Sequence, residues 1–253
     1  MSAATIDVLQ LTLAYGEFRV LDELTLQMPA DGIVGLIGPN GAGKSTLLSV
    51  IAGFMSPRSG EVRFHGAAIT GLAADARARQ GLVRTFQVPR EFKHLTVMQN
   101  LLAAPRGQAG ESLAGLLFQR SRIRQQEEAL REQALQWLRF LKLEAVADQP
   151  AGGLSGGQKK LLEIGRLLML EPRCMLLDEP FAGVNPVLIE QIGDRLRELH
   201  QRGLGLVIVE HHLHMLARLA QRLVVLDRGR LLAEGAPDAV LADPAVRSAY
   251  MGN

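Results

Sequence analysis

"GPNGAGKST", residues 38–46, is the segment of this chain that is most informative about its fold. It follows the apolar run "IVGLI" and leads into "KSTLLSVIAG". We therefore expect a strand buried on both faces, a glycine-rich turn and a helix, in that order. In this context the spacing G-x-x-x-x-G-K-[ST] is typical of a nucleotide-binding loop. Its backbone amides would surround the phosphates, Lys44 would reach the β and γ oxygens, and the Ser45 hydroxyl could bind Mg²⁺.

The segments on either side of this loop predict two kinds of sheet. On the N-terminal side, "LQLTL" (9–13), "LTLQM" (24–28) and "EVRFHG" (61–66) alternate apolar and polar residues, which indicates half-buried strands of an antiparallel sheet. On the C-terminal side, "CMLLD" (174–178), "GLVIVE" (205–210) and "RLVVLD" (222–227) are short apolar runs separated by helical patterns. These runs predict parallel strands joined by crossover helices. Residues 121–142 have the spacing of an amphipathic helix, with Ser121 as its expected N-cap.

Two acids end the apolar run "CMLLDEP". Asp178, at the end of the predicted strand, could hold Mg²⁺ through water, and Glu179 is placed to orient or deprotonate an attacking water. Adjacent acids behind an apolar strand are costly to bury unless a cation or a reaction uses them. The alternative interpretation is a surface turn after a strand.

Three further polar residues lie at or near the ends of strand-like runs. Gln87 stands in "VRTFQVP", and His211 directly follows "LVIVE", where a ring nitrogen could reach the γ-phosphate or the water. Tyr15 ends the first alternating run, where it could stack on an adenine or simply pack at a strand edge.

Several histidines raise the alternative of a zinc site. His211 is followed by His212 and His214, with His200 further back. The spacing H-H-x-H lacks the i, i+4 geometry of helical zinc ligands, and no thiol lies near it in the sequence. We therefore expect no zinc there.

Composition excludes several classes of protein. Apolar residues make up 47% and charged residues 21%, which fits a globular chain. No apolar run is long enough for a membrane span, and the N-terminus lacks the pattern of a signal peptide, so we expect a cytoplasmic chain. A net charge of +2 gives no reason to expect nucleic acid as a partner. The single cysteine, Cys174, rules out an internal disulfide and is expected to pack in the core.

In their order along the chain, these motifs resemble those of the ATP-binding subunit of ABC transporters, from about Ile6 to Gly235. By this resemblance, residues 38–46 are the Walker A loop and Gln87 is the Q-loop glutamine. "LSGGQ" (154–158) is the family signature, "CMLLDE" (174–179) is Walker B, "AGVN" (182–185) is the D-loop, and His211 is the switch histidine. The D-loop position that usually holds Asp is Asn185 here, which leaves any role of a carboxylate at that position open.

The resemblance implies a fold, a set of partners and a location. The fold would be an α/β P-loop NTPase (RecA-like) core with an N-terminal antiparallel β subdomain and an α-helical subdomain. Residues 1–253 would form one ATPase domain, with the helical part at roughly 87–170. Two such domains, identical or homologous, would pair head to tail, so that Ser155, Gly156 and Gly157 meet the γ-phosphate held by the Walker A loop of the other domain. Separate transmembrane permease subunits, and indirectly a periplasmic binding protein, would be partners at the cytoplasmic face of the inner membrane.

The resemblance also implies the residues of the site. The catalytic residues would be Glu179, His211 and Gln87, and Mg²⁺ would be held by Ser45, Gln87 and Asp178. The remaining residues expected to bind ATP are Tyr15, Gly38, Pro39, Asn40, Gly41, Ala42, Gly43, Lys44, Thr46, Leu154, Ser155, Gly156, Gly157 and Gln158.

Within the family, "RTFQVPREFKHLTVMQNLL", the segment inserted after Asn100 and the tail "DPAVRSAYMG" resemble importers of branched-chain amino acids. Importers of urea or short amides share these features. "DARARQGL", "LLDEPFAGV" and the tail also resemble the ATPase of lipopolysaccharide extraction. Two further alternatives are a soluble ABC ATPase acting on nucleic acid or the ribosome and a regulatory module that does not hydrolyse ATP. The first usually has a coiled-coil insertion, a second Walker A loop or a basic arm, which we do not find, and the second is disfavoured by Glu179 and His211.

Overall fold

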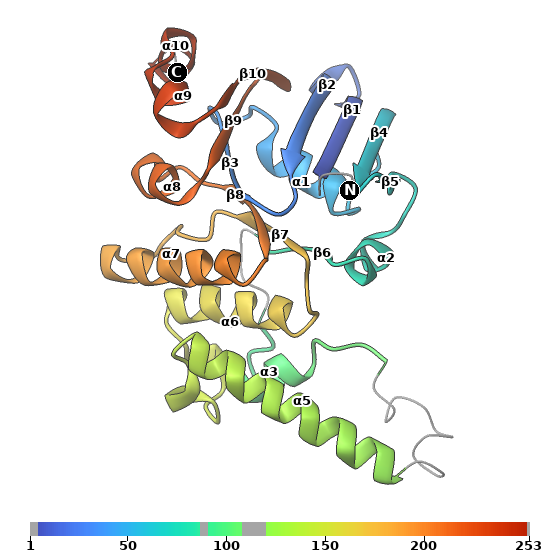
Figure 1. Cartoon of the computed structure of the whole chain (residues 1–253), viewed down its shortest axis with the longest axis vertical. Helices are drawn as coiled ribbons and strands as arrows, with labels where there is room; N and C mark the ends of the chain where they lie inside the picture. Colours follow the sequence, from blue (N-terminus) through green and yellow to red (C-terminus); the bar gives the residue numbers. More distant parts are fainter. Residues whose placement is uncertain (1–4, 87–90, 108–119, 252–253) are drawn as a thin grey trace. The chain divides into compact units, whose positions relative to one another are not determined.

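The computed structural model describes residues 5–86, 91–107 and 120–251. These residues divide into two compact units, whose elements are labelled in Figure 1. The first unit comprises Met1–Gln87, Pro172–Ala182 and Ile189–Asn253, and the second comprises Val88–Glu171 and Gly183–Leu188.

The first unit contains an antiparallel sheet with the strand order β2-β1-β4-β5. Its strands are β1 (Thr5–Tyr15), β2 (Phe18–Pro29), β4 (Ser59–Phe64) and β5 (Ala67–Ala68). Alternate residues are buried over residues 24–28 of β2 and 62–64 of β4, as the period of two in the sequence predicts, whereas β1 also buries three consecutive residues, 11–13. The antiparallel sheet expected from the alternating segments of the first 66 residues is therefore present.

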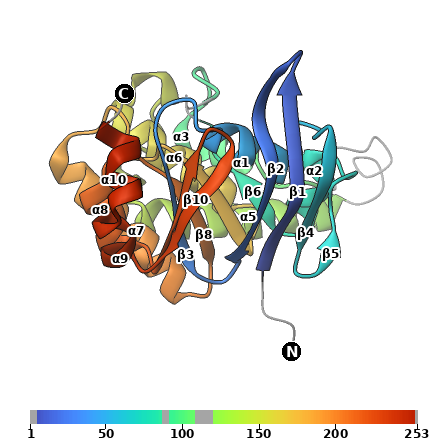
Figure 2. The same ribbon diagram turned by 90° about the horizontal axis from the view of Figure 1, so that it is seen from above.

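A second, six-stranded sheet of this unit has the order β10-β9-β3-β8-β7-β6. Its strands are β3 (Ile33–Ile37), β6 (Leu82–Arg84), β7 (Cys174–Asp178), β8 (Gly205–Val209), β9 (Arg222–Asp227) and β10 (Arg230–Gly235). All neighbours pair in parallel except β9 and β10. Every residue of β3, β7 and β8 is buried, which explains their continuous apolar sequences. β10 lies beside β2, so the two sheets meet along these strands (Figure 2).

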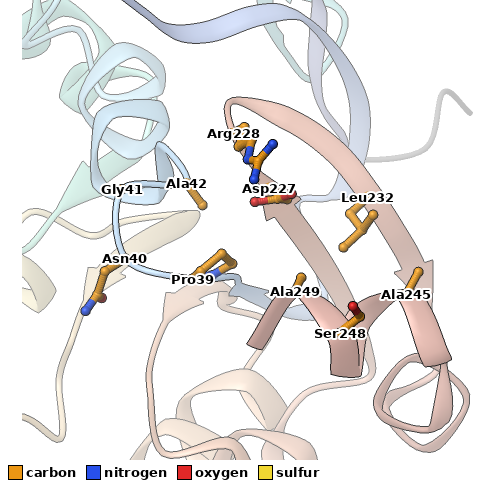
Figure 3. A pocket seen from close by; sticks show the side chains of 10 residues that line it. All are labelled: Pro39, Asn40, Gly41, Ala42, Asp227, Arg228, Leu232, Ala245, Ser248 and Ala249. Carbon is orange, nitrogen blue, oxygen red and sulfur yellow. The ribbon is translucent and has the colours of Figure 1, made fainter. Parts of the chain in front are cut away.

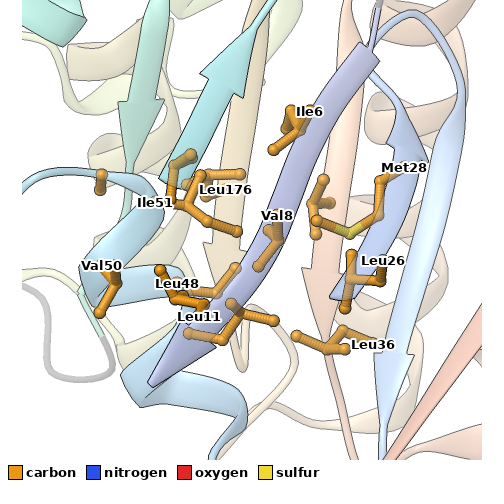
Figure 4. Packing of buried hydrophobic residues seen from close by; sticks show 14 of the residues in the cluster. Ile6, Val8, Leu11, Leu26, Met28, Leu36, Leu48, Val50, Ile51 and Leu176 are labelled. Carbon is orange, nitrogen blue, oxygen red and sulfur yellow. The ribbon is translucent and has the colours of Figure 1, made fainter. Parts of the chain in front are cut away.

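The core of the first unit lies between the two sheets and the helix that follows the glycine-rich loop. Figure 4 shows Val8 and Leu11 of β1 facing Leu48 of this helix, with Leu36 of β3 and Leu176 of β7 nearby. All of these side chains are fully buried. The glycine-rich loop is therefore attached at both ends to elements that the core holds in place.

That helix, α1 (Lys44–Ile51), is fixed at its C-terminal end by a buried arginine. Arg77, on α2 (Ala74–Arg79), donates from its guanidinium to the carbonyl oxygens of Val50 and Ile51 at 2.6 and 2.8 Å. A cation at the end of a helix satisfies its last carbonyls and complements its dipole. Burial lowers the pKa of Arg77.

The other helices that lie wholly in the first unit follow the later strands. They are α8 (Leu213–Leu219), α9 (Pro237–Ala242) and α10 (Pro244–Met251). α8 packs on β3 so closely that a Cβ at Gly35 would lie 2.8 Å from Leu216. Helix α7 (Pro186–Gln201) begins in the second unit and continues in the first.

The second unit is helical. Its elements are α3 (Val97–Leu102), α5 (Arg120–Phe140), η2 (Glu144–Val146), η3 (Ala151–Gly153) and α6 (Gly156–Leu168). Gly165 of α6 lets Leu141 and Leu101 approach, since a Cβ there would lie 2.9 Å from Leu141. The fully buried amide of Asn100 binds the backbone at Phe92, Leu95 and Thr96, which holds the start of α3.

The predicted fold class is confirmed, and one local detail is wrong. Helix α5 covers most of the residues predicted for it, but Ser121 is its second residue and not its N-cap. Among the described residues, no helix is long and apolar enough to cross a membrane.

Candidate active site

The loop between β3 and α1 curls around the ammonium group of Lys44. Its Nζ donates to the carbonyl oxygens of Gly38 and Pro39 at 2.7 and 2.9 Å. Gly38 and Gly43 have φ angles of 146° and 97°, and a Cβ at Gly38 would lie 2.0 Å from the carbonyl oxygen of Leu226. Only glycine fits there. A buried cation at the start of a helix, inside a loop of this shape, is suited to bind phosphate.

Burial lowers the pKa of Lys44, and the carboxylates of Glu179 and Asp178 act in the opposite direction. Both acids therefore lie close enough to the loop to influence its cation. A phosphate group placed there would add further negative charge and favour the protonated amine.

The end of β7 brings an acid to the start of α1. Ser45 Oγ donates to Asp178 Oδ1 at 3.0 Å, and Asp178 is 1% exposed. The second carboxylate oxygen accepts from Arg84 Nη2 at 2.8 Å, and Arg84 Nη1 also donates to Ser49 Oγ at 2.6 Å. The backbone N–H of Asp178 donates to Thr85 Oγ1 at 3.0 Å. The hydroxyl and the carboxylate are the oxygen ligands that Mg²⁺ prefers, in a fixed arrangement.

Glu179 and His211 meet at the ends of β7 and β8. His211 Nε2 lies 3.2 Å from Glu179 Oε1. Glu179 has a φ angle of 50°, which is uncommon for a residue other than glycine, and its N–H donates to Val209 O at 2.9 Å. Strained backbone of this kind is concentrated at functional sites. A carboxylate held beside an imidazole can act as a base toward water.

A buried acid that the sequence analysis did not single out holds this pair in place. Glu210 is 2% exposed, and its carboxylate accepts from the N–H of Phe181 at 2.6 Å, of His211 at 2.9 Å and of His212 at 3.4 Å. Burial raises the pKa of Glu210, and these three hydrogen bonds oppose the rise. The signal was available in the sequence, because Glu210 ends an apolar run just as Asp178 does.

Tyr15, which was expected to stack on adenine, lies at the surface of the first unit. Tyr15 ends β1 with its side chain exposed, and its hydroxyl lies 3.7 Å from the sulfur of Met55. The exposed ring is free to stack on a planar ligand. Gln87 lies outside the described residues.

The signature residues 154–158 lie in the second unit, where Leu154 follows η3, Ser155 is the N-cap of α6, and Gly156 is the first residue of that helix. Ser155 Oγ accepts from the N–H of Gln158 at 3.3 Å, and Gln158 Oε1 accepts from the N–H of Ser155 at 2.9 Å, which is a capping box. A Cβ at Gly157 would lie 1.8 Å from Leu188, so close packing requires glycine there. Ser155, Gln158 and Gly157 therefore each have a structural role in this unit, whether or not they also bind a ligand.

Asn185 has a comparable local role. Its Oδ1 accepts from the N–H of Leu188 at 2.9 Å, which caps the start of α7. Asn and Asp are equally good N-caps. Asn185 therefore meets this local requirement without a carboxylate.

Several known proteins are similar to this chain. The ABC transporter family model matches residues 21–182, and the model of branched-chain amino acid ATP-binding cassette transporters matches residues 230–253. A probable branched-chain amino acid transport ATP-binding protein, LivG, of Methanocaldococcus jannaschii is 40% identical over 94% of this chain and 93% of its own length. The high-affinity branched-chain amino acid transport ATP-binding protein BraF of Pseudomonas aeruginosa is 34% identical over 100% of this chain and 99% of its own.

A solved structure agrees with the sequence relatives. A nucleotide-free ATP-binding cassette from an ABC transporter superposes with a TM-score of 0.86 at 38% identity, covering 99% of this chain and 100% of that one. Family models, relatives and fold therefore lead to one conclusion. The chain belongs to the ATP-binding subunits of ABC transporters, which hydrolyse ATP to drive transport.

Proposed function

We propose that this chain powers the import of branched-chain or related hydrophobic amino acids through separate membrane subunits. The hydrolytic part rests above all on the pairing of Glu179 with His211 at 3.2 Å, at the ends of strands neighbouring the loop of Lys44. The choice of solute is supported by the names of the relatives and by the family match over the C-terminal residues 230–253.

In this proposal the loop of residues 38–46 binds the phosphates of ATP. The backbone amides and Lys44 hold the β and γ oxygens, and Tyr15 stacks on the adenine. Ser45 and Asp178, with Gln87, would hold Mg²⁺, which would neutralise charge between the β- and γ-phosphates. The 3.0 Å contact between Ser45 Oγ and Asp178 already places two suitable oxygens together.

Hydrolysis requires a water molecule aligned with the γ-phosphate. Glu179 would orient this water and accept its proton, while His211 would hold the carboxylate and contact the γ-phosphate. Glu210 would act as a positioning residue, because it binds the backbone of both segments. Catalysis then consists mainly of alignment and charge stabilisation.

The signature serves the second half of the site. Ser155, Gly156 and Gly157 would contact the γ-phosphate that another ATPase domain holds, in a head-to-tail pair of identical or homologous subunits. The γ-phosphate would stabilise the closed pair, and its release would open it. Opening and closing would move transmembrane permease subunits at the cytoplasmic face of the membrane, with a periplasmic binding protein delivering the solute.

Uptake of radiolabelled leucine tests this proposal. Cells lacking the gene should lose saturable leucine, isoleucine and valine uptake, and the wild-type gene should restore it. The variant Glu179→Gln is the matched control. It keeps the size of the side chain and removes the base, so its gene should not restore uptake.

Two results would contradict the choice of solute. One is leucine uptake that does not depend on the gene while urea or amide uptake does. The other is a loss of lipopolysaccharide from the cell surface with amino acid uptake intact. Restoration of uptake by Glu179→Gln would contradict the assigned base.

A further inference from the structure

The backbone of the glycine-rich loop is bound by a side chain from the far end of the chain. The N–H of Gly38 donates to the hydroxyl of Tyr250, on α10, at 2.7 Å. The two residues are 212 positions apart in the sequence. Burial raises the pKa of Tyr250, so its hydroxyl stays neutral at physiological pH.

Gly38 is the point at which the loop leaves β3, and it is bound on both sides. Its N–H is held by Tyr250, and its carbonyl oxygen accepts from Lys44 Nζ at 2.7 Å. With a φ angle of 146°, the residue has conformational freedom that only glycine possesses. These two hydrogen bonds restrict that freedom and fix the direction in which the loop departs from the strand.

Beyond Gly38, the loop lacks close packing on the side of α10. A pocket of about 520 Å³ lies there, with loop residues 39–42 on one side and Ala245, Ser248 and Ala249 of α10 on the other (Figure 3). At the end of this stretch the carbonyl oxygen of Ala42 accepts from the N–H of Gly229 at 3.1 Å. The loop is thus tied to the C-terminal part of the chain at Gly38 and at Ala42, on either side of an unfilled space.

Helix α10 is itself anchored, so that the hydroxyl is held at a defined position. Asp243 Oδ1 accepts from the N–H of Ala245 at 2.7 Å at the start of the helix. Arg247 Nε donates to Leu241 O at 3.1 Å, and Val246 is buried.

From this geometry we propose that Tyr250 is a positioning residue for nucleotide binding. Its hydroxyl holds the first peptide of the phosphate loop in the orientation that ATP requires, so the ordering of the loop is completed before the nucleotide arrives. The inference rests on the proposed role of residues 38–46 as the phosphate site. It gives the C-terminal helix α10 a function in that site.

The variant Tyr250→Phe tests the proposal, because it removes the hydroxyl and keeps the ring. The net contribution of one intramolecular hydrogen bond corresponds to about a fivefold change in an equilibrium constant, here that between loop conformations that bind ATP and those that do not. We expect the Kd and KM for MgATP to rise about fivefold with kcat unchanged, since the loop binds ground state and transition state alike. Amide hydrogen exchange should also accelerate in the peptide that contains Gly38 and should stay unchanged in peptides from β7 and β8. Asp238→Asn, at an exposed position of the neighbouring helix α9 outside this pocket, is the control and should leave both measurements as in the wild type.

Four outcomes separate the possible failures. Unchanged Kd and unchanged exchange in Tyr250→Phe would overturn the proposal, and so would faster exchange throughout the protein, which would mean a general loss of stability. Lys44→Ala examines the phosphate site separately. If Lys44→Ala binds MgATP normally, the assignment of the loop fails, whereas a loss of binding in Lys44→Ala with none in Tyr250→Phe leaves the loop assigned and removes only Tyr250.

Discussion

Replacing Glu210 by glutamine perturbs the support of the hydrolytic residues without changing the size of the side chain. In the wild type, one carboxylate oxygen accepts from Phe181 N–H, and the other accepts from the N–H groups of His211 and His212. A glutamine amide has only one oxygen, and its NH₂ group is a donor. In either orientation the NH₂ group faces a backbone N–H, so at least one of the two short hydrogen bonds is lost.

The loss of one of these hydrogen bonds sets the expected change in stability and in turnover. A buried N–H left without an acceptor costs about 1–3 kcal/mol, so we expect the free energy of unfolding to fall by about 2 kcal/mol. The NH₂ group of the glutamine and the backbone N–H that it faces repel each other. This repulsion displaces either the turn that contains Glu179 and Phe181 or the turn that contains His211. A displacement of about 1 Å at a reacting group lowers turnover by about 100-fold. Affinity for ATP should change little, because the hydrogen bonds of the Glu210 carboxylate go to Phe181, His211 and His212, which lie outside the phosphate loop.

Urea denaturation and steady-state ATP hydrolysis measure the two effects. The control is Glu190→Gln, which removes an exposed ion pair with Arg218 and should change stability by less than about 0.5 kcal/mol. Turnover in Glu210→Gln within about twofold of the wild type would refute the role of Glu210, even if stability fell. A fall in ATP affinity with normal turnover would also refute it.

Three further predictions concern other parts of the site. Arg84→Met should lower the free energy of unfolding by about 3–5 kcal/mol, measured in urea, because it leaves Asp178 buried without its cation; a loss similar to that of the exposed control Arg63→Met would contradict this reasoning. Ser155→Arg should bind MgATP in calorimetry but neither pair nor hydrolyse, and normal hydrolysis by this variant would mean that the signature is not part of the site. Burial raises the pKa of Glu210, so between the ordinary carboxyl pKa and the raised one the folded chain retains a proton that the unfolded chain releases. The free energy of unfolding of the wild type, relative to that of Glu210→Gln, should therefore fall as the pH rises through this range. An increase over the same range, measured by urea denaturation, would contradict the buried state of this acid.

Local patterns were sufficient to predict most of the fold. Continuous apolar runs gave the parallel strands, because β3, β7 and β8 are buried on both faces. Alternation gave the antiparallel sheet. The alternation did not predict that β10 is the edge strand of the six-stranded sheet and pairs antiparallel with β9. The spacing of apolar residues in a strand shows which face is buried but does not identify the strand with which it pairs.

The candidate site was predictable where its residues form contiguous motifs. Five of its residues belong to a motif or follow an apolar run, namely Lys44, Ser45, Asp178, Glu179 and His211. In the structure they lie at the ends of neighbouring strands. Their catalytic roles stay predictions.

Two of the residues that hold the site together, Arg84 and Tyr250, were not predictable in this way. Arg84 reaches Asp178 across 94 positions, and Tyr250 reaches Gly38 across 212, so only the three-dimensional fold connects them. Conversely, the capping by Ser155 and Asn185 shows that a motif residue can have a local structural role besides a contact with a ligand.

The joint binding of each ATP by the phosphate loop of one ATPase domain and the signature of another is the basis of the proposed mechanism. It is tested most directly by measuring ATP hydrolysis per chain over a range of protein concentrations, with the monomer fraction determined by sedimentation in the same buffer. We predict that hydrolysis per chain falls in proportion to the fraction of paired chains and that the monomer is inactive. A rate per chain that stays constant down to concentrations at which the protein is monomeric would contradict the account.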